Sequence, residues 1–155
     1  IEFPLHEIAQ IVHSGDSASA MSVFETAIPP HSPGAPPHQH THEDEIYYIL
    51  TGEMCFLLDE NVVRASAGDT VILPRGRVHA NWNLGSVETR ALTIVSADAP
   101  FEHFFDEVAR HLSSQETGSA EGALEAVSSV ADAMGVIIDM SKVPNEAESL
   151  FTPAQ

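Results

Sequence analysis

The sequence predicts an all-β fold, a sandwich or barrel of short strands with α-helices packed on it near the C-terminal end. Runs rich in β-branched and aromatic residues alternate with clusters of turn-forming residues up to about residue 97. After Ser96 the apolar residues recur at steps of three and four, the spacing of one helical face. We therefore expect one domain over residues 1–155, with a barrel over about 8–97, a helical extension over about 98–140 and an irregular tail over 141–155.

Each predicted strand is a run of apolar and β-branched residues between two turns. The runs are 22–26, 46–50, 54–58, 70–73 and 90–95. Proline and glycine mark the strand ends, because proline cannot donate to a strand ladder and glycine adopts positive φ without strain. Turns are therefore expected at 29–30, 33–34, 36–37, 51–52, 59–61, 67–69, 74–76 and 83–85.

Two helices are predicted after the strands. The first has Asp98 as N-cap, Pro100 in its first turn, and one apolar face made of Phe101, Phe104, Phe105, Val108, Ala109 and Leu112. A polar loop over 113–122 separates it from a second helix, which contains Leu124, Val127, Ala131 and Met134 and ends near Gly135. Because these helices are too small to form a core of their own, we expect them to pack on the barrel.

The composition excludes several classes of protein. The chain has 23 acidic and 6 basic residues, a formal charge of -17, which opposes binding to nucleic acid or to an anionic membrane. No apolar run reaches the roughly 20 residues that span a bilayer, and residues 1–6 lack the features of a secretory signal. Cys55 is the one cysteine, so no internal disulfide forms. We therefore expect a cytoplasmic protein.

The histidines are clustered, and residues 36–52 hold three of them together with three carboxylates. His38 and His40 leave the same face of a strand, because side chains alternate across it. Glu45 lies an odd number of residues beyond His40, so in one continuous strand it would face the other side. Residues 41–44 are therefore predicted to form a turn or bulge, after which an antiparallel strand brings Glu45 back beside the two histidines.

His79 is a further candidate ligand, expected to start an inward-facing strand after the turn at 74–76. Three imidazoles and one carboxylate suit a divalent transition ion, namely iron, manganese, cobalt, nickel, copper or zinc, and leave positions open for water, dioxygen or substrate. A single inward histidine is more often a hydrogen-bonded core residue, but three at these spacings beside Glu45 favour a metal site. His42 lies in the predicted turn, where we expect it beside the ligands or in solvent.

These residues resemble the two motifs of the cupins. The first, Gly-X5-His-X-His-X(3,4)-Glu-X6-Gly, is matched by Gly34, His38, His40, Glu45 and Gly52, except that Gly34 lies four positions before His38. The second, Gly-X5-Pro-X-Gly-X2-His-X3-Asn, is matched in full by Gly68, Pro74, Gly76, His79 and Asn83. The resemblance covers roughly half of the chain and implies a jelly-roll β-barrel. It also implies one metal ion inside, bound by His38, His40, Glu45 and His79.

The alternation of side chains along the strands predicts which residues line a substrate pocket inside the barrel, because residues an even number of positions from Glu45 or His79 face inward. The predicted pocket residues are Tyr47, Ile49, Phe56, Leu58, Asn81, Phe101, Phe104 and Phe105. A register shift of one residue on the strand after Gly52 would replace two of them with Cys55 and Leu57. The three phenylalanines of the predicted helix would close one end of the cavity, and ordinary packing against the sheet is the alternative.

The predicted first helix is similar to the segment that follows the barrel in cupins of the quercetin dioxygenase-like branch. This resemblance implies a metal-dependent dioxygenase that acts on an enolisable aromatic or polyketide-like small molecule. Glu45 would then take a proton from a substrate hydroxyl. The alternative is a metal-dependent isomerase, cyclase or decarboxylase without redox chemistry, and the third class is a small-molecule-binding protein without turnover.

The expected partners follow from the same reasoning. They are a small-molecule substrate, dioxygen and, by resemblance to other cupins, a second copy of this chain. Residues 8–12 and the outward-facing Ile46, Tyr48 and Leu50 would contribute to a homodimer, or else pack within one subunit.

Overall fold

The computed structural model describes residues 7–96, 102–114 and 120–152, and within them two antiparallel sheets face each other across a shared core. The first sheet has the order β1 (Glu7–Val12), β2 (Met21–Ile28), β10 (Thr89–Ser96), β5 (Asp44–Thr51) and β8 (Thr70–Leu73). The second has the order β11 (Val136–Ile138), β4 (His38–His40), β9 (His79–Asn83), β6 (Glu53–Leu58) and β7 (Asn61–Ser66), with β3 (Ser32–Pro33) also paired to β9. This arrangement confirms the predicted all-β jelly-roll with C-terminal helices.

The strands form where apolar and polar residues alternate in the sequence, because the inward residues of both sheets meet in one apolar core. The inward set is Ile28, Tyr47, Ile49, Met54, Phe56, Ala65, Val71, Leu73 and Ala91, all buried, with Leu58 partly buried against them. The five predicted runs lie within β2, β5, β6, β8 and β10. Phe56 is fully buried in this core, whereas Cys55 and Leu57 lie in a separate cluster on the other face of β6. The expected register of β6 is therefore confirmed.

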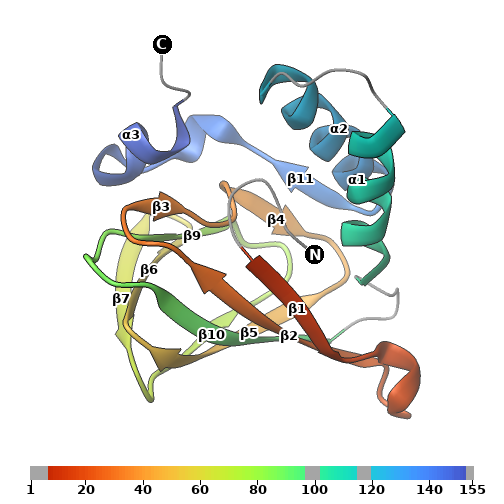
Figure 1. Ribbon diagram of the computed structural model, residues 1–155, viewed down its shortest axis with the longest axis horizontal. Coiled ribbons are helices and arrows are strands. Elements are labelled where there is room, and N and C mark those ends of the chain that lie inside the picture. The colour runs from red at the N-terminus through yellow and green to blue at the C-terminus, as the bar shows by residue number, and fades with distance from the viewer. Residues whose placement is uncertain (1–6, 97–101, 115–119, 153–155) are drawn as a thin grey trace.

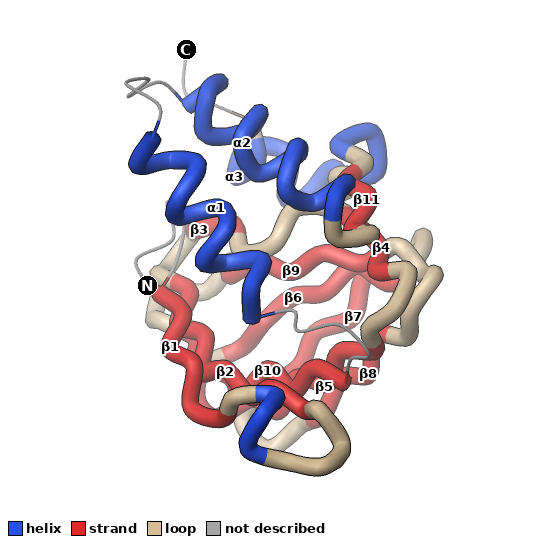
Figure 2. The backbone as a smooth tube through the Cα atoms, turned by 90° about the vertical axis from the view of Figure 1, so that its right-hand side faces the viewer, coloured by secondary structure: helices blue, strands red, loops and turns tan. Residues whose placement is uncertain are grey.

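Two helices lie beside the barrel, next to β4 and β11 (Figure 2). They are α1 (Glu102–Ser114) and α2 (Ala120–Ala133). Both overlap the polar loop expected over 113–122, because α1 ends after the predicted start of that loop and α2 begins before its predicted end. Phe105 packs edge-on against Phe24, with ring centroids 5.4 Å apart, and so attaches α1 to the first sheet. Asp98, Pro100 and Phe101 lie outside the described residues. None of the described helices combines the length and the apolar character needed to cross a bilayer.

The segment that follows α2 differs from the expected helix and irregular tail. Residues 136–138 form β11, which pairs antiparallel with β4, so the chain returns to the barrel as a strand. Three short helices follow, namely the 3-10 helices η2 (Met140–Lys142) and η3 (Asn145–Ala147) and the α-helical α3 (Glu148–Phe151). A three-residue strand leaves almost no periodic signal in the sequence, and its pairing with β4 is decided by long-range contacts.

The short C-terminal helices cover the outer face of the second sheet (Figure 1). Ala147 is buried in a cluster that contains Trp82, Leu57, Cys55 and Ala80, with Val143, Leu150 and Phe151 packed on it. As a result, all five residues of β9 are buried, since the core lies on one face of the strand and the tail on the other. Trp82 is fully buried there. The strand therefore alternates between polar residues, of which His79 and Asn81 face the interior, and the apolar Ala80 and Trp82, which face the C-terminal segment.

The outer face of the first sheet carries several of the residues that were expected to contribute to a homodimer, whereas Ile8 is buried against Phe24 and Val95 and so packs within one subunit. Tyr48 is 41% exposed and Leu50 is 37% exposed, and both belong to the outward row of β5. Ile11 on the edge strand β1 is 52% exposed. The homodimer itself stays a prediction.

Gly135 is the turn that lets the chain pass from α2 into β11. Its φ is +74°, and a Cβ atom there would collide with the hydroxyl of Thr41, whose Oγ1 and backbone N both donate to the Gly135 carbonyl at 2.9 Å and 3.0 Å. We expect Gly135→Ala to lower the free energy of unfolding by about 1–2 kcal/mol from the backbone conformation alone, and by more because of the collision. Chemical denaturation measures the loss.

Gly76→Ala is the matched control for this substitution. Gly76 has the same φ of +74°, but nothing lies within 4 Å of the Cβ position. It therefore carries the backbone strain without the collision. Equal losses for the two variants would contradict the view that close packing of Gly135 against Thr41 holds β11 on β4.

Candidate metal centre

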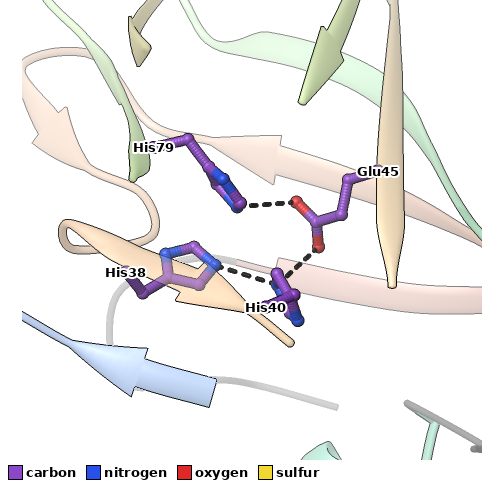
Figure 3. Close-up of side chains that lie close together, drawn as sticks. All are labelled: His38, His40, Glu45 and His79. Carbon is purple, nitrogen blue, oxygen red and sulfur yellow. Dashed lines mark hydrogen bonds and ion pairs between the residues drawn. The ribbon is translucent and has the colours of Figure 1, made fainter. Parts of the chain in front are cut away.

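Three strands from two sheets bring His38, His40, Glu45 and His79 together inside the barrel (Figure 3). His38 and His40 are the two ends of β4, His79 begins β9, and Glu45 lies at the start of β5. One ligand atom from each residue lies within 4.8 Å of those from the others. His38 also pairs directly with His79 in the ladder between β4 and β9. The predicted set of ligand residues is therefore assembled in one place.

The route of the chain between His40 and Glu45 differs from the expected hairpin. The ladders of β4 are with β9 and β11, whereas those of β5 are with β10 and β8, so the two strands belong to opposite sheets. Residues 41–43 carry the chain across from one sheet to the other. Glu45 therefore meets the histidines across the interior and not as a neighbour in the same sheet. Facing sheets lie about 10 Å apart, a gap that a glutamate and an imidazole together span.

The spacing of the donor atoms fits a single ion. The Nε2 atoms of His38 and His40 are 3.1 Å apart, and Glu45 Oε1 lies 3.4 Å from His40 Nε2. Glu45 Oε2 lies 3.6 Å from His79 Nε2. Two donors that each lie about 2.1 Å from one ion are about 3.0 Å apart at a right angle and about 3.4 Å apart at a tetrahedral angle. The observed separations are close to these values.

Each imidazole turns its Nδ1 atom away from the centre toward an oxygen. His38 Nδ1 donates to the carbonyl of Pro36 at 2.7 Å, and His79 Nδ1 donates to the carbonyl of Arg77 at 3.0 Å. His40 Nδ1 lies 3.3 Å from Glu43 Oε2. A proton on Nδ1 leaves the Nε2 lone pair available, which is the tautomer that a metal ligand requires. Among the described residues, His79 Nε2 has no hydrogen-bond partner, although it is fully buried.

The burial of this cluster controls its charges. Burial, with the nearby His79 and His40, lowers the pKa of His38 to about 3. Burial also opposes the charged form of His40, but Glu45 and Glu43 outweigh it and raise the pKa of His40 to about 9. Burial disfavours a charged Glu45 as well, yet His40 and His79 hold the pKa of Glu45 well below its usual range. The surroundings therefore stabilise a positive charge between two buried carboxylates, as a cation site requires.

Tyr47 and Asn81, two of the predicted pocket residues, form a buried polar pair close to Glu45. Asn81 Nδ2 donates to the Tyr47 hydroxyl at 3.1 Å, and Asn81 Oδ1 accepts from the backbone N of Ala35 at 3.0 Å. Gly34 fits against this amide, because a Cβ atom there would collide with Asn81 Oδ1. Burial and the charge of Glu45 raise the pKa of Tyr47 above its ordinary range, so its phenol stays neutral.

The other predicted pocket residues lie farther along the lumen or outside it. Ile49 and Phe56 are fully buried members of the central core, and Leu58 packs against that core while partly exposed. Phe104 and Phe105 pack α1 onto α2, β11 and the first sheet. Their placement agrees with the alternative of ordinary packing, and Phe101 lies outside the described residues. A direct role for these residues in substrate binding stays a prediction.

The remaining residues of the two motifs have structural partners. Asn83 Nδ2 donates to the carbonyls of Ile28, Pro29 and Val87 at 2.8–3.0 Å, and so ties the loop after β9 to the end of β2. His42 is exposed to solvent, which is one of the two positions expected for it, the other being beside the ligands.

The polar partner that sequence reasoning missed is Glu43. It is only 2% exposed, although it lies in a run of acidic and histidine residues that is typical of a solvated turn. Its proximity to His40 depends on the shape of residues 41–43, which strand parity does not describe. Thr26 and Thr93 were also missed. Their hydroxyls lie 3.1 Å apart in the interior, and alternation along β2 and β10 was the signal that could have found them.

Comparison with known proteins gives matches over the barrel. Residues 24–95 match the family model described as cupin domain. Germin-like protein subfamily T member 2 of Arabidopsis thaliana is 33% identical over 70 residues, which cover 42% of this chain and 32% of the plant protein. The chain thus spans less than half the length of the curated relatives that it matches.

Two solved structures share both the fold and a quarter or more of the aligned residues. A predicted oxalate decarboxylase of Thermotoga maritima superposes with a TM-score of 0.55 at 29% identity, over 59% of this chain and 80% of that one. The DMSP lyase DddQ of Ruegeria pomeroyi superposes with a TM-score of 0.52 at 28% identity, over 61% of this chain and 48% of the lyase. The family model, the fold and both motifs therefore agree that residues 24–95 resemble a cupin domain.

Proposed function

We propose that this chain is a metal-dependent cupin enzyme whose His38, His40, Glu45 and His79 hold one divalent transition ion. The observation that carries the proposal is the orientation of the three imidazoles. Each has its Nδ1 beside an oxygen acceptor, and the Nε2 atoms and the Glu45 carboxylate meet inside the barrel. His79 Nε2 is buried, has the Glu45 carboxylate 3.6 Å away and makes no hydrogen bond of regular geometry among the described residues, which fits a nitrogen that serves as a metal donor.

The donor set selects a class of ion and a class of chemistry. Three imidazole nitrogens and one carboxylate oxygen suit iron, manganese, cobalt, nickel, copper or zinc. When bound, such an ion supplies Lewis-acid polarisation of a substrate oxygen and, in the redox-active metals, one-electron chemistry with dioxygen. His38 is 7% exposed, whereas His40 and His79 are fully buried, so the site is largely withdrawn from water. Exclusion of water strengthens the interactions made there.

Glu45 is the residue of this chain best placed to move a proton. It is a buried carboxylate whose pKa is held well below its usual range by His40 and His79, so it is ionised at neutral pH. In the proposed reaction its Oε1 or Oε2 accepts the proton of a substrate hydroxyl. The neutral Tyr47 hydroxyl and the Asn81 amide come from opposite sheets, meet in the interior, and would orient the substrate by hydrogen bonds.

For the substrate we propose an enolisable aromatic or polyketide-like molecule, and for the reaction a quercetinase-like dioxygenation. The residues packed beyond the metal centre are mainly apolar, so a substrate that reached the ion between them would be favoured if it were flat and hydrophobic. All six Lys and Arg side chains are exposed on the surface. A substrate with several negative charges would therefore find no Lys or Arg side chain inside the barrel.

A non-redox reaction is the second candidate, favoured by the solved structures. The two solved structures described above, which are 28% and 29% identical to this chain, are named as a lyase and a predicted decarboxylase. Both candidates begin with the same demands on this chain, namely a bound ion and an ionised Glu45. They differ in whether dioxygen is consumed.

Removing any one imidazole tests the proposed ion site. We expect His38→Ala, His40→Ala and His79→Ala each to retain the fold and to lose most of the bound metal, because the remaining donors no longer enclose the ion. Elemental analysis of proteins purified without added metal measures the content per chain. His42→Ala is the matched control, since this neighbouring histidine is exposed, and it should keep wild-type content. Full metal content in all three ligand variants would refute the site.

Oxygen consumption separates the two reaction classes. With iron, manganese, nickel, cobalt or copper bound, we expect oxygen uptake that depends on an added flavonol or another enol. We expect it to fall at least about 100-fold in Glu45→Gln, because the substitution removes the proposed proton acceptor and also weakens one of the four proposed metal donors. An oxygen electrode and product analysis measure both. Turnover of a small acid under anaerobic conditions with zinc bound would instead select the decarboxylase or lyase chemistry and reject the dioxygenase.

A further inference from the structure

Glu43 is a buried carboxylate that neither motif nor the proposed proton transfer uses. It lies in the crossing between β4 and β5 and is 2% exposed. Its Oε2 atom is 3.3 Å from His40 Nδ1 and, among the residues that the structure describes, makes no hydrogen bond of regular geometry. A carboxylate withdrawn from water is costly unless a donor or a positive charge faces it. The group that faces Glu43 is the imidazole of His40.

The three imidazoles of the metal centre are not anchored in the same way. His38 and His79 donate from Nδ1 to backbone carbonyls, which are neutral and belong to the residues two positions earlier, Pro36 and Arg77. The Nδ1 of His40 faces a side-chain carboxylate instead. A carboxylate on the far nitrogen fixes the ring and makes the near nitrogen more basic than a carbonyl does. His40 is therefore the ligand whose orientation a single side-chain substitution can change.

Glu43 does not lie where a further ligand would lie. The imidazole ring of His40 separates the nitrogen that faces Glu43 from Nε2, which lies 3.4 Å from Glu45 Oε1. The cluster of groups that could share an ion consists of His38, His40, Glu45 and His79 among the described residues, and Glu43 is outside it. Its contact with the centre is therefore made through His40.

We infer that Glu43 is a positioning residue of the metal centre, which holds His40 with its proton on Nδ1 and its Nε2 lone pair directed at the ion. The inference rests on the proposed function, because it requires that the four side chains bind a divalent transition ion. It adds a role for a residue at a position that the first motif leaves unspecified. The expected consequence is a loss of metal affinity without loss of any ligand.

Co²⁺ titration of the metal-free full chain, followed by visible absorption, tests this inference. Removal of an outer partner of a ligating histidine typically weakens metal binding about 10- to 100-fold, and we expect Glu43→Ala to do so. Glu43→Gln should fall between the wild type and Glu43→Ala, because its amide oxygen still accepts from Nδ1 but carries no charge. The Co²⁺ absorption bands of Glu43→Ala should also shift, since His40 is no longer held in one orientation.

Asp44→Asn is the matched control. Asp44 is the next residue, and its carboxylate accepts from the guanidinium of Arg75 on the surface, at 3.1–3.3 Å, and not from a ligand. This variant should bind Co²⁺ as the wild type does. Circular dichroism of each metal-free variant checks that it is folded, and Glu43→Met, which keeps the length of the side chain but offers no acceptor oxygen, takes the place of Glu43→Ala if the latter does not fold.

The outcomes separate the inference from the proposed function. If the wild type binds no Co²⁺, the proposed metal centre fails. If the wild type binds and the variant without an acceptor, Glu43→Ala or Glu43→Met, binds with the same affinity and the same absorption bands, the role of Glu43 is overturned. A graded loss from wild type to Gln to the variant without an acceptor, with Asp44→Asn unchanged, supports it.

Discussion

The convergence of three imidazole nitrogens and one carboxylate across the interior of the barrel is the constraint on which the rest of this molecule depends. In the absence of an ion, positive charge on His40 lies between Glu43 and Glu45, both nearly inaccessible to water. Two buried carboxylates on opposite sides of one imidazole are tolerated because a positive charge on that ring faces both of them. The same electrostatics that keep Glu45 ionised therefore also make the centre a cation site.

The position of the donors depends on how the two sheets are held. His38, His40 and His79 belong to one sheet and Glu45 to the other, so the distance between the sheets sets the distance between the donors. β4 is short and meets β9 directly at a single residue pair, and its longer ladder is with β11. The backbone N of Asp139 donates to the Pro37 carbonyl at 2.8 Å, and Thr41 donates to Gly135 on the other side. The C-terminal segment thus holds both ends of the strand that carries two of the ligands.

The C-terminal residues also support the metal centre by packing on the outer face of the sheet that carries its histidines. The short helices after β11 bury Trp82 and complete a second apolar layer behind β9. A strand that is buried on both faces is stiff and well ordered, and β9 begins with His79 and continues through Asn81 to Asn83. The region expected to be an irregular appendage therefore supports the same strand that carries a proposed ligand and a pocket residue. Its interior face carries the polar contact with Tyr47.

The sequence by itself determined the all-β class, the inward parity of the main strands and the identity of the four candidate ligands. These features are local, because alternation and motif spacing are written in residues close together in the chain. The tertiary structure decided that the chain changes sheets between His40 and Glu45, that residues 136–138 pair with β4, and that Glu43 lies against His40. None of these three features produces a periodic pattern of residues in the nearby sequence. Each depends on which distant backbone or side chain occupies the neighbouring space, and that is settled only when both sheets and the C-terminal segment pack together.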